Sequence, residues 1–376
     1  MMGVTRHLAW DCAPSLLNFT FPTSLMKAYL LTGIHDLARQ TRPLVLDDIP
    51  DPVAGPREIV IRVSCCGICH TELDEIEGRT PPPAYPVVPG HQVVGVVSEA
   101  GHDARRFKPG DRVGVAWIYH ACGRCDRCRE GMENLCDGFV ATGRDVHGGY
   151  AEYMKVEEDF AYALPDVFKD EEAAPLLCAG AIGYRSLRLA SLQDGKAIGL
   201  MGFGASGHLV HMMVKHLYPG SGIYVFARSG EEREFALSLG AIWAGGPEEK
   251  PPCLLAAIID TTPVWKTVVS SLACLAPGGR LVVNAIRKEP GDKYALLGLE
   301  YETHLWMEKE IKSVANIARG DVGEFLKLAG KIPIRPSVQV YPFAEANTAL
   351  LDLKNKHVKG AKVLWVGNGR QAGFIG

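Results

Sequence analysis

Four cysteines of this chain lie within fifteen residues, at Cys122, Cys125, Cys128 and Cys136. Their spacing, C-x2-C-x2-C-x7-C, allows four thiolates to surround one Zn²⁺ ion in a closed tetrahedral site of the structural kind. An iron–sulfur cluster is the alternative, because its motifs also use C-x2-C-x2-C. A nucleic-acid-binding zinc ribbon is disfavoured, since acidic residues offset the neighbouring arginines. The pattern predicts a metal-binding lobe over 122–136, with zinc as the expected metal.

Further residues of metal-binding type occur in three shorter motifs, each of them weak alone. The motifs are Cys69-His70-Thr71-Glu72, Gly90-His91-Gln92 and Leu177-Cys178-Ala179-Gly180. A single buried Cys is more often a small core residue than a ligand. The interpretation of these motifs therefore depends on the rest of the chain.

A glycine-rich loop follows a predicted strand over 197–201 and precedes a predicted helix over 206–217. Its sequence is Gly202-Phe203-Gly204-Ala205-Ser206-Gly207. In this context G-x-G-x-x-G predicts a dinucleotide site. The glycines permit a tight turn and close approach of a pyrophosphate, and the helix N-terminus offers it free N–H groups.

The end of the next predicted strand, over 223–227, bears on the choice of nucleotide. An NAD-binding chain is expected to place Asp or Glu there, about 20 residues after the last glycine. Ala227 stands at that position, and Arg228 and Ser229 follow it with groups that bind phosphate. This segment favours NADP(H), with NAD(H) as the alternative because Glu231 and Glu232 come directly after it.

These motifs, in this order, resemble the zinc-dependent alcohol dehydrogenases of the medium-chain dehydrogenase/reductase family over about residues 26–376. The resemblance implies that Cys69, His91 and Cys178 bind a catalytic Zn²⁺ with its fourth position open. With the lobe, this implies two zinc ions per chain. Thr71 matches the hydroxyl that binds the substrate oxygen and begins a proton relay, and Glu72 matches a carboxylate that orients the ligand histidine.

The same resemblance places His70 beside the cofactor and Trp117 beside the substrate. Trp117 and Ile118 imply an apolar pocket for short or medium aliphatic, or aromatic, alcohols and aldehydes. Two positions depart from the family pattern. Gln92 replaces a Glu that usually follows the ligand histidine, and Asp74 replaces a relay histidine, so a role for Asp74 in proton transfer is a hypothesis.

The elements that must position these residues change in kind along the chain. Short predicted strands over 26–31, 58–64, 93–98 and 112–116, separated by Gly- and Pro-rich turns, indicate a barrel-like β domain. After about residue 165, a predicted helix over 171–192 begins a series of alternating strands and helices, which indicates a parallel sheet. The expected fold class is α/β, with a GroES-like β-barrel catalytic domain and a Rossmann doubly wound cofactor domain.

The expected organisation has four parts. They are an N-terminal extension over 1–25, the catalytic domain over 26–178, the Rossmann domain over 179–315, and a return to the catalytic domain over 316–376.

Composition excludes several other classes. The 376 residues carry 40 Lys+Arg and 43 Asp+Glu, a net charge of −3, which argues against nucleic acid as a partner. No apolar run is long enough to cross a membrane. The odd count of 11 cysteines, clustered and without a signal peptide before them, favours a reducing cytoplasm.

The predicted function is reversible hydride transfer between a nicotinamide cofactor and a small alcohol or aldehyde. By resemblance we expect a homodimer or homotetramer. Two alternatives stay open at this point. One is an NADPH-dependent enone reductase on the same fold, and the other is a zinc-binding regulatory protein with a vestigial site.

Overall fold

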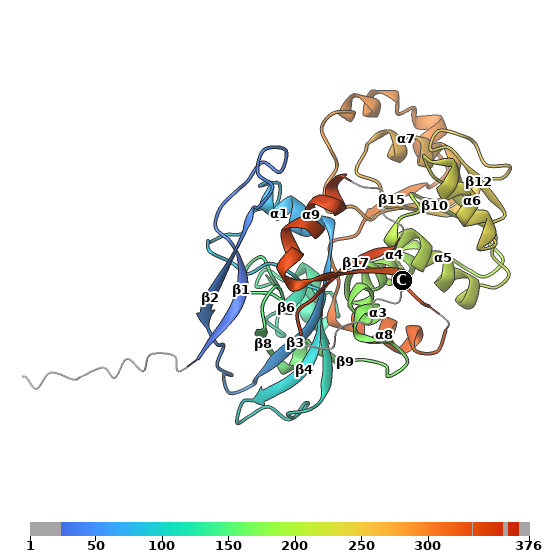
Figure 1. The fold of residues 1–376 in the computed structure, drawn as a ribbon. Helices are drawn as coiled ribbons and strands as arrows, with labels where there is room; N and C mark the ends of the chain where they lie inside the picture. Colours follow the sequence, from blue (N-terminus) through green and yellow to red (C-terminus); the bar gives the residue numbers. More distant parts are fainter. Residues whose placement is uncertain (1–23, 333, 356–359, 368–376) are drawn as a thin grey trace, which may run out of the picture.

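The computed structural model describes residues 24–332, 334–355 and 360–367 (Figure 1). The expected extension over 1–25 therefore lies outside the described residues, apart from Ser24 and Leu25. Within the described ranges, the strands form a seven-stranded sheet, a six-stranded sheet and two two-stranded ribbons. No helix in these ranges is long and apolar enough to cross a membrane.

The seven-stranded sheet is organised around β3, the strand that ends at the first metal-binding motif. Its order is β16-β17-β3-β4-β5-β9, and β8 also pairs with β3. The strands are β3 (Glu58–Ile68), β4 (Val93–Ala100), β5 (Arg112–Val115), β8 (Tyr153–Glu157), β9 (Ala161–Ala163), β16 (Val338–Pro342) and β17 (Ala361–Trp365). The ribbons are β1 (Leu25–Leu31) with β2 (Leu44–Pro50), and β6 (Ile118–His120) with β7 (Val140–Ala141).

The six-stranded sheet is parallel throughout, in the order β12-β11-β10-β13-β14-β15. Its strands are β10 (Ile198–Met201), β11 (Ile223–Phe226), β12 (Trp243–Gly245), β13 (Leu255–Asp260), β14 (Leu275–Val283) and β15 (Glu310–Ser313). Successive strand residues point to opposite faces, so Leu200 and Ile259 join one hydrophobic cluster while Met201 and Ile258 join another. Two covered faces are what a doubly wound fold requires.

The crossover helices lie against these two faces. They are α4 (Ala181–Ala190), α5 (Ala205–Leu217), α6 (Gly230–Ser238) and α7 (Lys266–Cys274). Figure 1 shows them gathered on one side of the molecule, with the blue and cyan strands of the β sheet on the other. The α/β fold class predicted from the sequence is thereby confirmed.

The last part of the chain contacts both halves. After β15, α8 (Arg319–Ala329) packs against α4. α9 (Ala346–Asn355) packs against α1 (His70–Ile76), at the junction of the two halves in Figure 1. β17 then pairs antiparallel with β3, from Lys362 opposite Ile68 to Trp365 opposite Cys65. This pairing fixes the end of β3, where Cys69 follows.

The helical segment predicted over 171–192 is confirmed over 170–190, with one wider turn inside it. The structure has α3 (Asp170–Pro175), a π-helical turn η3 (Leu176–Gly180) and then α4. Pro175 has no backbone N–H and cannot sustain a regular α-helical ladder, so the wider turn begins directly after it. Such turns are common at functional sites, and this one carries Cys178.

Short helical segments complete the described chain. They are α2 (Asp126–Arg129), η1 (Glu133–Leu135), η2 (Glu158–Phe160), η4 (Lys293–Gly298), η5 (Tyr301–Leu305) and η6 (Phe343–Glu345).

Candidate active site

A cleft of about 1840 Å³ runs between the two halves of the molecule and receives side chains from both. Most of the residues that the sequence singled out line it. These are Cys69, His70, Thr71, Asp74, His91, Gln92, Trp117, Cys178, Gly202, Gly204, Ala205, Ser206 and Arg228. Among the described residues that were predicted for the site, Glu72, Ile118, Gly207 and Ser229 are not part of its lining.

Three potential ligands come together at one end of the cleft. Cys69 follows β3 and caps α1, His91 precedes β4, and Cys178 sits in the π-helical turn. Their donor atoms all lie within 4.8 Å of one another, and the two Sγ atoms are 4.0 Å apart. Zinc–thiolate bonds of about 2.3 Å in a tetrahedron place sulfur atoms roughly 3.8 Å apart. The spacing of this donor set therefore fits zinc.

Glu72 contacts two of these three ligands, His91 and Cys69. Its Oε1 lies 2.6 Å from His91 Nδ1, and its Oε2 accepts a hydrogen bond of 2.8 Å from the backbone N–H of Cys69. Both the histidine and the carboxylate are buried. The contact to Nδ1 leaves the other ring nitrogen, Nε2, as the one available to a metal.

The two thiols, Cys69 and Cys178, shift each other's pKa. A hydrogen bond from Cys178 lowers the pKa of Cys69, helped by His91, whereas the neighbouring Cys69 sulfur and burial raise the pKa of Cys178. Burial opposes charging of His91, yet Glu72 and Cys69 together raise its pKa. The group thus favours one thiolate and resists a second negative charge. A bound dication would remove that conflict, which is a second reason why these residues fit zinc.

Three neighbours of the ligands face the cleft in different ways. Thr71 Oγ1 lies 3.4 Å from Cys69 Sγ, so its hydroxyl sits beside the candidate metal position. His70 is exposed. Gln92 is buried, and a Cβ added to Gly67 would lie 2.6 Å from its Oε1. The side chain of Gln92 therefore requires glycine at the end of β3.

Asp74 is occupied by two arginines. Its Oδ1 contacts Arg79 Nε at 2.5 Å and Arg287 Nε at 3.2 Å, and its side chain is only 7% exposed. Arg287 follows β14 in the parallel-sheet half, so this ion pair bridges the cleft. A carboxylate held by two guanidinium groups is poorly placed to pass protons to solvent. The geometry favours Asp74 as an anchor between the two halves over the relay role that the sequence analysis considered.

The rim cations Arg79, Arg287 and Lys354 are cleft residues that sequence reasoning missed. Lys354 Nζ lies 2.5 Å from Glu77, which also pairs with Arg79. Partial burial opposes it, but these two cations lower the pKa of Glu77. The three rim cations come from three separate segments of the chain, and no local sequence motif marks any of them. Only the placement of α9 and of the chain after β14 brings them together.

The two aromatic and apolar pocket candidates differ. Trp117 lines the cleft, and its ring meets the His91 ring edge to face at a centroid distance of 4.8 Å. Ile118 is fully buried in β6, within the large hydrophobic cluster. Trp117 lies in the bend before β6, and of the two residues only Trp117 lines the cleft. The expectation for Ile118 therefore finds no support in its position, whereas Trp117 remains a candidate wall.

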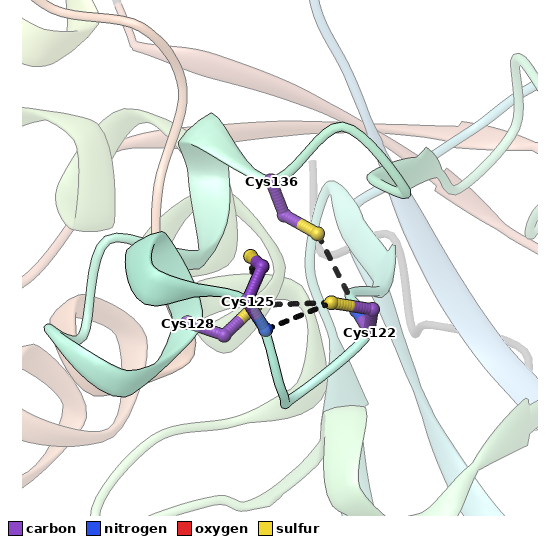
Figure 2. A group of neighbouring side chains, drawn as sticks. All are labelled: Cys122, Cys125, Cys128 and Cys136. Carbon is purple, nitrogen blue, oxygen red and sulfur yellow. Dashed lines mark hydrogen bonds between the residues drawn. The ribbon is translucent and has the colours of Figure 1, made fainter.

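The four-cysteine lobe forms a second, separate donor set. The four side chains point toward one another, and their sulfur atoms all lie within 4.8 Å (Figure 2). Cys122 and Cys128 have Sγ atoms 3.9 Å apart, and Cys125 and Cys128 have theirs 3.5 Å apart. These separations again match the edges of a zinc tetrahedron, roughly 3.8 Å.

Backbone N–H groups prepare the lobe for anionic sulfur. Hydrogen bonds from the amides of Arg124 and Cys125 lower the pKa of Cys122 to about 6. Burial and the neighbouring thiols raise the pKa of Cys128 to about 12. As at the first site, some thiolate charge is favoured and more is resisted until a cation joins it.

The glycine loop shows three distinct uses of glycine. Gly202 has φ +88°, which favours glycine, and a Cβ there would lie 2.6 Å from Thr261 Oγ1. A Cβ on Gly207 would lie 2.6 Å from the carbonyl oxygen of Gly202, so this residue allows α5 to pack closely. A Cβ on Gly204 would meet nothing within 4 Å. Gly204 therefore faces open cleft at the N-terminus of α5, where a pyrophosphate would fit.

The end of β11 supplies the other nucleotide candidates. Ala227 is buried in the cleft wall, and Arg228 is exposed beside it. Ser229 caps α6, because its Oγ accepts a hydrogen bond of 3.1 Å from the backbone N–H of Glu232. Glu232 also lines the cleft. One cation and one carboxylate thus flank the position expected for the ribose.

A glycine loop and a Cys2His donor set that face each other across one cleft define a metal- and nucleotide-dependent oxidoreductase. The comparisons agree. The family model described as the alcohol dehydrogenase GroES-like domain matches residues 55–166. A probable alcohol dehydrogenase, AdhA, of Mycobacterium tuberculosis (strain CDC 1551 / Oshkosh) is 40% identical over 333 residues, covering 87% of this chain and 94% of the relative.

Two solved structures extend the comparison. A cinnamyl alcohol dehydrogenase (SbCAD4) from Sorghum bicolor has a TM-score of 0.79 at 29% identity, with coverage of 92% of this chain and 99% of that chain. A thermostable alcohol dehydrogenase from Pyrobaculum aerophilum, with cobalt and zinc bound, has a TM-score of 0.77 at 26% identity, with coverage of 91% and 99%. The chain belongs to the zinc-dependent alcohol dehydrogenases of the medium-chain dehydrogenase/reductase family.

Membership of this family confirms the function predicted from the sequence. The protein is an oxidoreductase with NAD(P)-dependent alcohol dehydrogenase and aldehyde reductase activity.

Replacing Asp74 by Asn distinguishes an anchor from a proton relay. As an anchor, Asp74 supports Arg287 in the cleft wall, so Asp74→Asn raises the KM values by roughly fivefold, the value of a partly buried ion pair, with little change in kcat. Arg287→Gln, which removes the other partner, gives a similar rise. The measurement is the pH profile of kcat for both variants. A large fall in kcat with a displaced pH profile, found for Asp74→Asn alone, supports the relay instead.

Proposed function

We propose that this enzyme interconverts small to medium apolar alcohols and aldehydes with NADP(H), using one catalytic and one structural zinc ion per chain. One observation carries the proposal: Cys69, His91 and Cys178 line one end of the cleft, and Gly204 of the glycine loop lines the other end. Aldehyde-dependent oxidation of NADPH by purified protein, with NADH measured alongside, is the direct test.

The chemistry divides between the metal and this chain. When bound at Cys69, His91 and Cys178, zinc supplies a Lewis acid that polarises an aldehyde oxygen or favours an alkoxide. Thr71 holds the substrate oxygen by a hydrogen bond, and its hydroxyl passes the alcohol proton on to water in the cleft, or a proton from that water to the oxygen in the reverse direction. Glu72 fixes the ring of His91 through Nδ1. Trp117 narrows the space beside the ligands and excludes water from the hydride path.

The nucleotide occupies the other end of the cleft in this proposal. Its pyrophosphate lies over Gly202, Gly204 and the first residues of α5, including Ala205 and Ser206, and His70 contacts it from the opposite wall. The preference for NADP(H) is supported by the side chains at the end of β11. Ala227 presents no carboxylate to a 2′-phosphate, and the exposed Arg228 offers a guanidinium group to it.

The domain limits proposed from the sequence are 26–178, 179–315 and 316–376. They are supported by the sheets, because the first contributes β3, β4 and β5 to one sheet and the second contributes the whole parallel sheet. The third returns β16 and β17 to the first sheet. We also place the enzyme in the cytoplasm, which the ten described cysteines support because all are free thiols.

A homodimer through β15 is the assembly we propose. This strand is the edge of the six-stranded sheet, and all four of its residues are exposed. Large apolar side chains are exposed in the same stretch, among them Leu297, Trp306 and Ile311. A second copy paired antiparallel about Ile311 would set Glu310 opposite Lys312 on both sides, which is a self-complementary arrangement of charge.

Metal analysis checks the two zinc sites. Elemental analysis is expected to find two zinc ions per wild-type chain and one in each of Cys125→Ser and Cys69→Ser. Cys125→Ser lowers the melting temperature, because a closed site contributes to folding. Cys69→Ser abolishes turnover while the fold persists. Iron in the lobe, or wild-type activity in the Cys69 variant, contradicts the assignment.

Steady-state kinetics with both nucleotides checks the cofactor preference. We expect a higher kcat/KM with NADPH than with NADH, and Ala227→Asp reverses this preference because Asp accepts from the ribose 2′-OH and repels a 2′-phosphate. An Arg–phosphate contact contributes about 1–3 kcal/mol, so roughly 5- to 150-fold is at stake. Arg228→Gln is the control, and it is expected to lower kcat/KM with NADPH without changing kcat/KM with NADH. Better use of NADH by the wild type assigns the acidic role to Glu231 or Glu232.

Sedimentation velocity checks the proposed dimer. Ile311→Glu introduces like charges at the centre of the paired edge and is expected to yield monomers. Val340→Glu is the matched control, since Val340, like Ile311, is a half-exposed β-branched residue on an edge strand, but its strand, β16, belongs to the other sheet. A wild-type monomer, or dimers in all three proteins, would rule out assembly through β15.

A further inference from the structure

The four-cysteine lobe is tied directly to a wall of the cleft. The segment over 314–319, here called the crossover, consists of the connection between β15 and α8 together with Arg319, the first residue of α8. Val314, Ala315, Asn316 and Ile317 of the crossover line the cleft, as does Asn134 of the lobe. A ligand in the cleft therefore faces the place where lobe and crossover meet.

Two lobe residues clamp the crossover. Asn134 Nδ2 donates a hydrogen bond of 2.5 Å to the carbonyl oxygen of Ala315. Glu133 accepts a bond of 3.0 Å from the backbone N–H of Arg319 and one of 2.6 Å from Arg319 Nε. The Glu133 side chain is only 7% exposed, so the carboxylate of this ion pair is shielded from water, while the Arg319 side chain is 35% exposed. The Arg319 guanidinium also lies over the Phe160 ring, 4.9 Å from its centroid.

The clamp and the lobe share one short helix. Glu133 and Asn134 belong to η1, which ends against Cys136. The backbone N–H of Cys136 donates to the carbonyl oxygen of Glu133 at 3.0 Å. Cys136 Sγ in turn accepts from the backbone N–H groups of Cys122 and Gly138. One end of η1 thus belongs to the cysteine cluster, and its other residues hold the crossover.

The crossover makes few other hydrogen bonds within its cleft-lining part, where Val314 and Ile317 pack into the large hydrophobic cluster. At its start, Val314 N–H donates to the carbonyl oxygen of Val283, and near its end Ala318 N–H donates to Asp321. Between them, Asn316 has φ +61°, a left-handed conformation that Asn adopts more readily than most residues with a side chain, and the chain bends there. The clamp supplies contacts on both sides of this residue, at Ala315 and at Arg319.

We propose that Glu133, assisted by Asn134, is a positioning residue that sets the cleft wall of this enzyme from the four-cysteine lobe. The lobe then governs affinity for cofactor and aldehyde, in addition to any contribution it makes to folding. This inference rests on the proposed function in one respect, namely that nicotinamide cofactor and substrate bind in this cleft.

The experiment compares two substitutions of the same chemistry in the same lobe. Glu133→Gln removes the charge of the clamp, whereas Glu130→Gln is its matched control. Glu130 pairs with Arg127 at 3.7 Å on the exposed face of the lobe, where its side chain is 55% exposed. Glu133→Gln is expected to raise KM for NADPH and for the aldehyde about three- to tenfold, with a smaller change in kcat. Glu130→Gln leaves both constants at the wild-type values.

Two readouts separate positioning from general destabilisation. Zinc content is expected to remain at the wild-type value in Glu133→Gln. Hydrogen exchange of the backbone amides over 314–319 becomes faster in this variant and not in Glu130→Gln, because the Arg319 amide loses its charged acceptor. This exchange measurement needs no substrate, so an inactive wild-type preparation would count against the proposed function while the clamp is still tested.

Arg319→Gln tests the clamp from the other side without altering the lobe. It is expected to raise the same KM values, and the double variant Glu133→Gln/Arg319→Gln is no worse than either single variant, since both remove one interaction. If Glu133→Gln loses zinc, Arg319→Gln with full zinc content decides. Unchanged KM values in Arg319→Gln, or equal effects of Glu133→Gln and Glu130→Gln, would overturn the proposal.

Discussion

The catalytic end of the cleft depends on holding two half-buried thiols, a buried imidazole and a buried carboxylate close together. Negative charges this close repel each other strongly when water is excluded. The hydrogen bond between the two thiols lowers the pKa of Cys69 and raises that of Cys178, so the pair favours one thiolate over two. A dication between the sulfur atoms turns the repulsion into attraction, so the site fits a metal for electrostatic as well as geometric reasons. The pairing of β17 with β3 and the π-helical turn after Pro175 both serve to hold these ligands in place.

Local chemistry explains which features the sequence predicted well. The four cysteines of one short lobe, and the three glycines between a strand and a helix, lie close together in the sequence, so their spacing alone indicates a function. The structure gives Gly202, Gly204 and Gly207 three different reasons to be glycine, all of which the motif implies. Less could be predicted where a residue's surroundings depend on distant parts of the chain. The π-helical turn after Pro175 and the packing that buries Ile118 are examples, because spacing in the sequence reveals neither.

Asp74 shows the same limit in electrostatic form. Its place in the sequence, five residues after Cys69, invited a comparison with a proton relay. Its partners are Arg79, a few residues away, and Arg287, on the far side of the cleft. A carboxylate that faces two guanidinium groups contributes more by joining the two halves than by exchanging protons. This geometry supports our proposal that proton transfer takes place beside Thr71, at the ligand end of the cleft.

The two cysteine groups differ in what surrounds them, and this difference indicates which of them is suited to catalysis and which to a structural role. At the cleft, three donors lie beside open space, which is the arrangement of a site that admits substrate. In the lobe, four donors close on one another, and three of them are half-buried near the surface. A closed site has no position left for chemistry, but it can fix a short segment that has little core of its own. Because η1 joins Cys136 to Glu133, and Glu133 joins Arg319, that fixed segment extends to the cleft wall. In our proposal, the closed metal site supplies the rigidity that keeps this wall of the cleft in place beside the open site.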